Sequence, residues 1–165
     1  MSNNEHFWET KSLNQMTKVE WESLCDGCGK CCLHKLEDID TGEVSVSNVS
    51  CSFLDQTSCK CKDYNNRNEN VPDCIQLDLK NLKKLDWLPS TCAYRLIDEG
   101  KSLHDWHHLI SGSSETIHER GMSVRDYSIN ETSLKNVEEY ILAVSYTHLR
   151  AHETLRYLVC RLLLE

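Results

Sequence analysis

Apolar residues at helical spacing precede the first cysteines of the chain. Trp21 and Leu24 recur at the spacing of one helix face. Thr17 and Glu20 form a capping box, in which a hydroxyl and a carboxylate each satisfy an amide at the helix end, and Met16 stands at the position of a hydrophobic staple to Trp21. This pattern predicts a short helix that leads into the first group of cysteines.

The following segment alternates apolar and polar residues, as a half-buried strand does. Val44 and Val46 are separated by single polar residues, and residues 40–42 read Asp-Thr-Gly, a turn-forming sequence. We therefore expect a β-hairpin with arms at residues 33–39 and 43–47.

Residues 51–74 show no periodicity long enough for a helix. The segment is polar and rich in asparagine, so it cannot bury a continuous apolar face. A segment of this kind needs support from outside to become ordered, and thiolate–metal bonds supply such support.

Helical periodicity returns after this polar segment. Asp78 can cap a helix that carries Leu79, Leu82 and Leu85 and ends before Pro89. Further short helices are predicted at residues 92–99, 106–110, 114–120 and 134–142. The resulting fold class is α+β, small and irregular, with short helices and one β-hairpin around a cysteine-rich metal centre. We expect one domain over residues 1–143.

The cysteine content of the chain is unusually high. The chain has 10 cysteines in 165 residues, and its first residues lack the basic and apolar regions of a secretory signal. A reducing cytoplasmic location then favours metal binding by the thiols over disulfides or merely buried thiols. The net charge of -8 and the absence of a basic stripe argue against nucleic acid as a partner, and no run of roughly 18 apolar residues predicts a membrane span. The sequence leaves the protein partner open.

The cysteine spacing predicts metal but leaves the metal open. Cys25, Cys28 and Cys31 form two overlapping C-x-x-C units, a spacing that zinc knuckles and iron–sulfur loops both use. Cys32 follows directly, and because adjacent side chains diverge, we expect either two neighbouring metals or one metal and one uninvolved thiol. The later cysteines are spaced irregularly, unlike those of a ferredoxin or a zinc ribbon: Cys51, Cys59, Cys61 and Cys74.

These cysteines and their neighbours resemble a known family. The chain is similar to the CxxCxxCC cysteine-cluster family (YkgJ-type), described as chelating zinc or iron, through Cys25-x-x-Cys28-x-x-Cys31-Cys32, Cys51-x-x-Leu54-Asp55, Cys61-x-x-Tyr64-x-x-Arg67 and Cys74. The run Trp87-Leu88-Pro89-x-Thr91-Cys92 and the pair Ser111-Gly112 resemble its YcgN-like bacterial branch. The resemblance implies a bacterial cytoplasmic protein with these metal ligands: Cys25, Cys28, Cys31, Cys32, Cys51, Cys61 and Cys74. Cys59 and Cys92 belong to the branch pattern only, and Ser52 and Asn68 stand where members often have proline.

The last segment, residues 144–165, resembles a translated sequencing-library adapter rather than a natural protein end. We therefore expect a non-native tail, whose leucine-rich composition can still give a helix, and which should dock poorly or project. Cys160 should then lie away from the other thiols.

No nucleophile–base pair, phosphate loop or dinucleotide fingerprint accompanies the cysteines. The leading hypothesis is a metal-binding protein that holds zinc or iron, the iron either as ions or as an iron–sulfur cluster. The alternatives are an interaction module with purely structural zinc and a cluster-dependent enzyme whose catalytic residues are unknown. His34 is expected to be either an exposed strand residue or a substitute for one thiolate. His104, His107 and His108 are expected either to pack a helix surface or to act as ligands.

Overall fold

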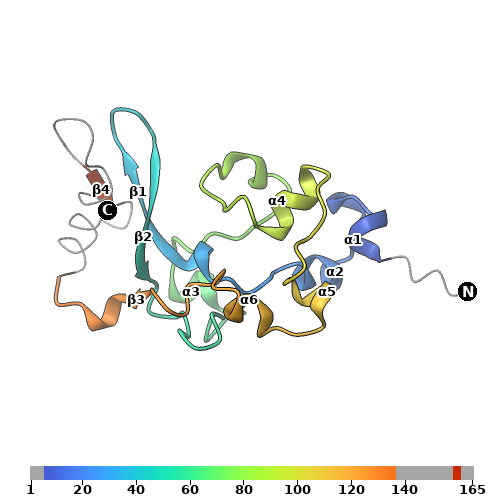
Figure 1. The fold of residues 1–165 in the computed structure, drawn as a ribbon. Coiled ribbons are helices and arrows are strands. Elements are labelled where there is room, and N and C mark those ends of the chain that lie inside the picture. Colours follow the sequence, from blue (N-terminus) through green and yellow to red (C-terminus); the bar gives the residue numbers. More distant parts are fainter. Residues whose placement is uncertain (1–5, 137–157, 161–165) are drawn as a thin grey trace, which may run out of the picture. The chain divides into compact units, whose positions relative to one another are not determined.

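The computed structural model describes residues 6–136 and the backbone of residues 158–160. The chain divides into two compact units (Figure 1). We call the described residues of Met1–Cys28 and Gln76–Ser123 the helical unit, and those of Gly29–Ile75 and Val124–Glu165 the cysteine unit. The expectation of one domain over residues 1–143 stays a prediction.

The helical unit is built from single-turn and two-turn helices. The capping box predicted at its start is confirmed, since the Thr17 hydroxyl accepts the Glu20 amide and the Glu20 carboxylate accepts the Thr17 amide. Its elements are α1 (Phe7–Thr10), η1 (Leu13–Gln15), α2 (Lys18–Ser23), η3 (Leu82–Lys84), α4 (Ala93–Asp98), α5 (His108–Ser111) and α6 (Thr116–Glu119).

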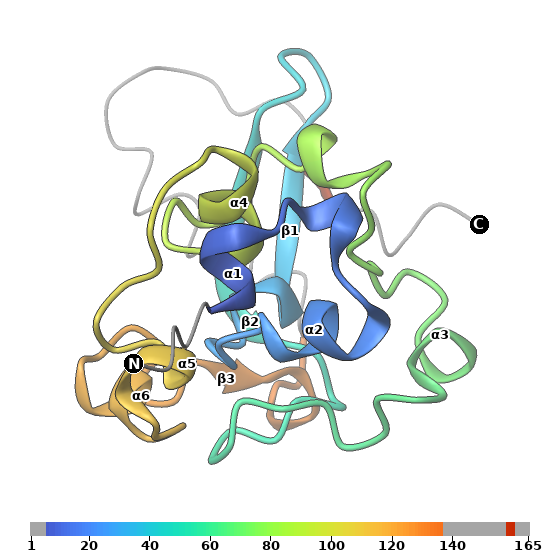
Figure 2. The same cartoon turned by 90° about the vertical axis from the view of Figure 1, so that its right-hand side faces the viewer.

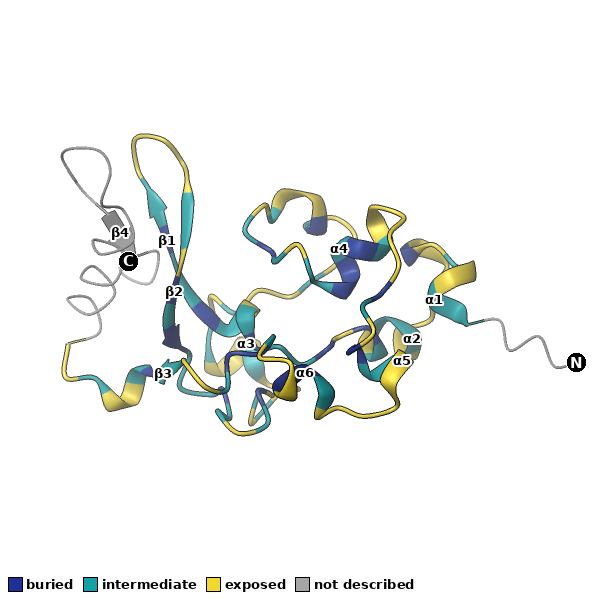
Figure 3. Ribbon diagram, viewed as in Figure 1, coloured by how far each residue is buried: buried dark blue, intermediate teal, exposed yellow. Residues whose placement is uncertain are grey.

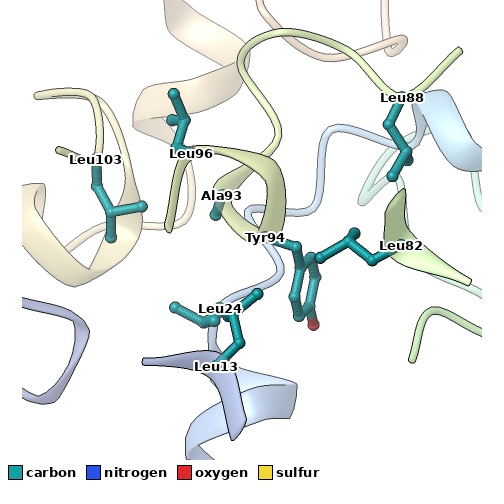
Figure 4. Close-up of a cluster of buried hydrophobic side chains, with 8 residues drawn as sticks. All are labelled: Leu13, Leu24, Leu82, Leu88, Ala93, Tyr94, Leu96 and Leu103. Atoms are coloured by element: carbon teal, nitrogen blue, oxygen red, sulfur yellow. The ribbon is translucent and has the colours of Figure 1, made fainter. Parts of the chain in front are cut away.

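An apolar core joins these short helices. Its buried members are Leu13, Leu24, Leu82, Leu88, Ala93, Tyr94, Leu96 and Leu103 (Figure 4). The helix α4 carries three of them and is coloured largely as buried in Figure 3. The Tyr94 hydroxyl donates to the carbonyl of Trp21 at 2.9 Å, so the buried phenol has a partner and also fixes the end of α2.

The helix predicted from Asp78 is wrong in length. Only the three residues of η3 are helical, and Leu79 is 48% exposed. The Asp78 carboxylate accepts the amides of Lys80 and Asn81, and the Asn81 side chain accepts the Asp78 amide, so local side-chain bonds replace the helical ones. The helices expected at residues 106–110 and 114–120 also occur in shorter form, as α5 and α6.

The cysteine unit contains a small sheet, and the predicted hairpin is confirmed. The strands β1 (Leu33–Asp38) and β2 (Val44–Ser50) pair antiparallel, and β3 (Ile129–Asn130) pairs parallel with β2. The sheet order is β3-β2-β1-β4. The unit also holds the short turns η2 (Lys30–Cys32), α3 (Arg67–Asn70) and η4 (Glu131–Ser133). Helices and sheet together confirm the α+β class.

The strand β4 (Leu158–Cys160) overturns part of the expectation for the tail. It pairs antiparallel with β1, in the register Leu36 to Cys160, so these three residues are not helical and do not project from the sheet. Main-chain pairing at an open sheet edge requires no matched side chains, which is why an edge strand accepts such a segment. The rest of residues 144–165 and the side chain of Cys160 lie outside the described residues, and the adapter origin stays a prediction.

The chain between β2 and α3 is irregular, as the sequence predicts (Figure 2). The apolar cluster of this unit is small, and its buried members are Leu33, Leu54, Cys59 and Val124. No helix in the described part of the chain is long and apolar enough to cross a membrane.

Candidate metal centre

Two glycines shape the loop that carries the first cysteines. Gly27 and Gly29 both have positive φ, at 75° and 74°, a backbone conformation that glycine adopts without strain. A Cβ on Gly29 would come 2.7 Å from Val124 Cγ2 and 3.2 Å from Cys59 Cβ. Position 29 therefore packs directly on the apolar cluster of the cysteine unit and fixes the start of η2.

The sulfurs of Cys31 and Cys32 lie 4.0 Å apart. The expectation that these adjacent side chains diverge is therefore wrong. Two thiolates on one tetrahedral zinc ion lie about 3.8 Å apart, given zinc–sulfur bonds of ~2.3 Å. The hydrogen bond with Cys31, followed by burial and the nearby Cys31 charge, holds the pKa of the Cys32 thiol well above its usual range. A cation beside this pair would favour the thiolates instead.

Three more cysteines of the same unit lie in the polar segment, and one of them contacts this pair through its backbone. The Cys51 amide donates to the Cys32 carbonyl at 3.0 Å, and Cys61 forms an isolated β-bridge with Leu54. The Cys74 amide closes a turn on Val71 at 2.9 Å. Beside burial, the nearby Cys51, Cys61 and Cys31 thiols raise the pKa of Cys74. Cys51 also adds to the larger effects of Cys31 and burial that raise the pKa of Cys32. We call them the five-cysteine group: Cys31, Cys32, Cys51, Cys61 and Cys74.

Two cations accompany the five-cysteine group. Lys35 Nζ donates to the Cys31 carbonyl, and burial lowers the pKa of Lys35 although the nearby cysteines oppose that shift. Arg67 lies 3.8 Å from the centroid of the Tyr64 ring and donates to the Tyr64 carbonyl at 2.6 Å. Burial raises the pKa of the Cys74 thiol, and Arg67 partly opposes this effect. These positive charges suit a site that gathers several thiolates.

The other predicted cysteines occupy different surroundings. Cys25 is exposed and Cys28 is half-buried, and both belong to the helical unit. Cys59 is buried in the apolar cluster with φ of 54°, and Cys92 precedes α4 and packs on the helical core. None of the nine described cysteines is disulfide-bonded. The structure thus gathers five of the predicted ligands in one unit and assigns Cys59 to apolar packing.

Asp26 provides a separate observation in the helical unit. Its side chain is buried, with an exposed fraction of 9%, and Oδ1 accepts the Cys28 amide at 3.0 Å. Oδ2 is buried without a hydrogen-bond partner. An unpaired buried carboxylate oxygen is costly, and a cation bound by the neighbouring thiolates would offset that cost. The carboxylate therefore fits a bound metal.

The thiolate donors of the five-cysteine group suit zinc or iron. Within residues 6–136, no three histidine, cysteine, aspartate or glutamate side chains already stand close enough to hold an ion. Closing the five-cysteine group on a metal therefore requires side-chain rotation. Convergence of the predicted ligands on one ion stays a prediction.

Two histidines, His107 and His34, make structural contacts in the described residues. His107 is buried, its Nδ1 accepts the Leu109 amide at 3.1 Å, and its Nε2 lies 3.0 Å from the Leu24 carbonyl. His34 is not an exposed strand residue, because its side chain is only 10% exposed and pairs with Glu131. Sequence reasoning missed Glu131 and Lys35. No local signal marks Glu131, which lies 97 positions from its histidine partner.

Comparisons with known proteins identify the family of the chain. Residues 24–93 match the profile of the CxxCxxCC family, described as a "Putative zinc- or iron-chelating domain". A UPF0260 protein of Rhizorhabdus wittichii is 53% identical over 142 residues, which cover 86% of this chain and 97% of that protein. A UPF0260 protein of Mesorhizobium japonicum is 56% identical over 81% of this chain and 91% of its own length. One of Brucella melitensis is 59% identical over 72% of this chain and 78% of its own length. No solved structure matches the chain. The chain therefore belongs to the UPF0260 family and carries that family's cysteine-cluster domain.

Proposed function

We propose that this protein binds zinc or iron in the cytoplasm through the thiolates of the five-cysteine group. The observation that carries the proposal is the 4.0 Å spacing of the Cys31 and Cys32 sulfurs, in the same unit as Cys51, Cys61 and Cys74. Cys25 and Cys28 are further candidate ligands on the family motif. When bound, the metal would supply either a structural cross-link or, as an iron–sulfur cluster, electron transfer.

The protein's own residues have separate roles in this proposal. Cys31 and Cys32 provide two sulfurs at nearly the spacing of one tetrahedral ion. Lys35 and Arg67 offset the negative charge that several thiolates bring together. The glycine turn at residue 29 holds η2 on the apolar cluster, so the first two thiols begin from a fixed backbone.

Elemental analysis of protein purified without oxygen tests the proposal. We expect zinc or iron bound at a fixed ratio to the chain. A brown colour that bleaches in air, with sulfide present, identifies an iron–sulfur cluster, whereas zinc leaves the protein colourless. Protein that retains neither metal after gentle dialysis would refute the proposal.

Single substitutions locate the bound metal. Cys61→Ser and Cys74→Ser should lose metal in dialysis that the unaltered protein withstands, because each removes one thiolate. Cys59→Ala is the matched control, since this thiol lies in the apolar cluster of the same unit. Equal loss of metal from Cys59→Ala, without unfolding, would show that the five-cysteine group is not the site.

A further inference from the structure

Glu131 lies far along the chain from the cysteines and outside the segment that matches the family profile. It begins η4, directly after β3. The parallel pairing of β3 with β2 places Asn130 opposite Ser50, one residue before Cys51. The sheet thus brings a carboxylate from the end of the described chain to the start of the polar cysteine segment.

The Glu131 carboxylate contacts two parts of the cysteine unit. Oε1 accepts the Ser52 amide at 2.6 Å, and Oε2 lies 2.7 Å from His34 Nε2 on β1. Burial by itself would raise the pKa of the Glu131 carboxyl, but the Ser52 hydrogen bonds and His34 outweigh burial and lower it. The carboxylate therefore stays ionised near neutral pH and makes charge-assisted hydrogen bonds.

Neighbouring contacts fix the peptide groups on both sides of Cys51. The Cys51 amide donates to the Cys32 carbonyl at 3.0 Å. The Asn130 side-chain amide donates to the carbonyls of Cys51 at 3.3 Å and of Ser52 at 3.4 Å. With the Glu131 contact to the Ser52 amide, the backbone around Cys51 is held from η2, β3 and η4.

We propose that Glu131, through its contacts with Ser52 and His34, is a positioning residue that holds Cys51 in place for metal binding. The proposal rests on the function proposed above. We call these contacts the Glu131 clamp. The polar segment has few apolar residues to order it, so the position of its first thiol depends on hydrogen bonds from elsewhere. Holding a ligand before the metal arrives reduces the entropy lost on binding.

The test compares Glu131→Ala and Glu131→Gln with the unaltered chain. Alanine removes both contacts, whereas glutamine keeps an acceptor for the Ser52 amide and a group that can bond His34. Glu43→Gln is the matched control, because Glu43 is an exposed carboxylate in the hairpin of the same unit. Two measurements are made: alkylation of each cysteine in metal-free protein, followed by mass spectrometry, and affinity for cobalt, followed by its thiolate absorption bands.

In metal-free Glu131→Ala, Cys51 should be alkylated on the order of 10-fold faster, the factor expected for losing the charge-assisted hydrogen bond to the adjacent Ser52 amide. Cys59, buried in the apolar cluster, should keep its rate. Cobalt affinity should fall roughly 10- to 100-fold, as when partners of metal ligands are removed. Glu131→Gln should recover most of both effects, and Glu43→Gln should show neither.

An unchanged Cys51 rate in Glu131→Ala would overturn the clamp. A rise for Cys59 equal to that for Cys51 would also overturn it, because it would indicate general loosening of the unit. If the unaltered protein binds no cobalt, zinc or iron, the proposed function fails, while the alkylation rates in metal-free protein still decide whether the clamp holds Cys51.

Discussion

The helical unit buries eight apolar side chains in one described cluster, and the cysteine unit buries four in its own. The first cluster includes leucines from several helices and a hydrogen-bonded tyrosine. The second includes a cysteine, and its unit also depends on hydrogen bonds such as those of Glu131. Apolar burial of the first kind stabilises a fold directly, whereas a small polar unit needs a metal or another cross-link. The two units should therefore respond differently to the same treatments.

Metal removal should have the largest effect and should act on the cysteine unit. Structural zinc contributes on the order of 10 kcal/mol to the folding of small thiolate domains. Chelation should therefore raise hydrogen exchange and proteolysis within residues 51–74 first. All four tryptophans belong to the helical unit, so tryptophan fluorescence should change little. If protection of residues 51–74 and the native tryptophan fluorescence were lost together, the chain would instead unfold as one domain.

Loss of a core leucine should affect the other unit. Leu96→Ala removes a side chain that is 5% exposed in the helical core and should cost about 2–5 kcal/mol of unfolding free energy. Denaturant unfolding followed by tryptophan fluorescence measures this change, and metal content per chain should stay constant. Val19→Ala is the control, because Val19 is 79% exposed. Loss of metal from folded Leu96→Ala would contradict the expectation that the two units respond separately.

Substitution of the two glycines of the cysteine unit should have an effect of intermediate size. Gly29→Ala and Gly42→Ala both place a Cβ at positive φ, but only at Gly29 would that Cβ meet Val124 and Cys59. Overpacking should make Gly29→Ala less stable than Gly42→Ala by about 1–3 kcal/mol. Hydrogen exchange of β1 and β2 measures the difference. Equal effects would mean that the small cluster has little part in the stability of this unit.

The smallest effect should come from pH in the helical unit. Burial lowers the pKa of His107, so the folded state prefers the neutral ring. The stabilising contribution of the neutral ring is present above the unfolded pKa of about 6.5, and it is lost as the pH falls from there through the lower pKa of the folded state. The free energy of unfolding measured by tryptophan fluorescence should therefore fall below about pH 6.5. His107→Gln should make unfolding less dependent on pH in this range, and an unchanged dependence would exclude His107 as its cause.

Local features of the fold could be predicted from neighbouring residues. The capping box of Thr17 and Glu20 and the β1–β2 hairpin each depend on contacts within a few positions, and both occur as expected. The helix from Asp78 failed because the side chains of Asp78 and Asn81 make local bonds that compete with helical ones. Periodicity alone does not reveal that competition.

The cysteines of the candidate site could be named from the sequence, and their metal binding stays a prediction, but their surroundings could not be predicted. The C-x-x-C spacing and the family resemblance pointed to Cys31, Cys51 and Cys74, which the structure gathers in one unit. The contact between Glu131 and His34 depends on parallel strand pairing between distant segments, and no pattern in either segment indicates the other. The 4.0 Å spacing of the Cys31 and Cys32 sulfurs likewise depends on side-chain rotamers, which adjacency in sequence does not determine.

The distance along the chain between Ser52 and Glu131 also sets an order of events during synthesis. The two residues are 79 positions apart. Ribosomes add roughly 5–20 residues per second, so Glu131 emerges on the order of 10 s after Ser52. During that interval the nascent chain already exposes the candidate ligand Cys51 without the carboxylate proposed to hold it. Stable metal loading should therefore follow emergence of β3 and Glu131 from the ribosome. Until then, the cysteines that emerged earlier are open to oxidation.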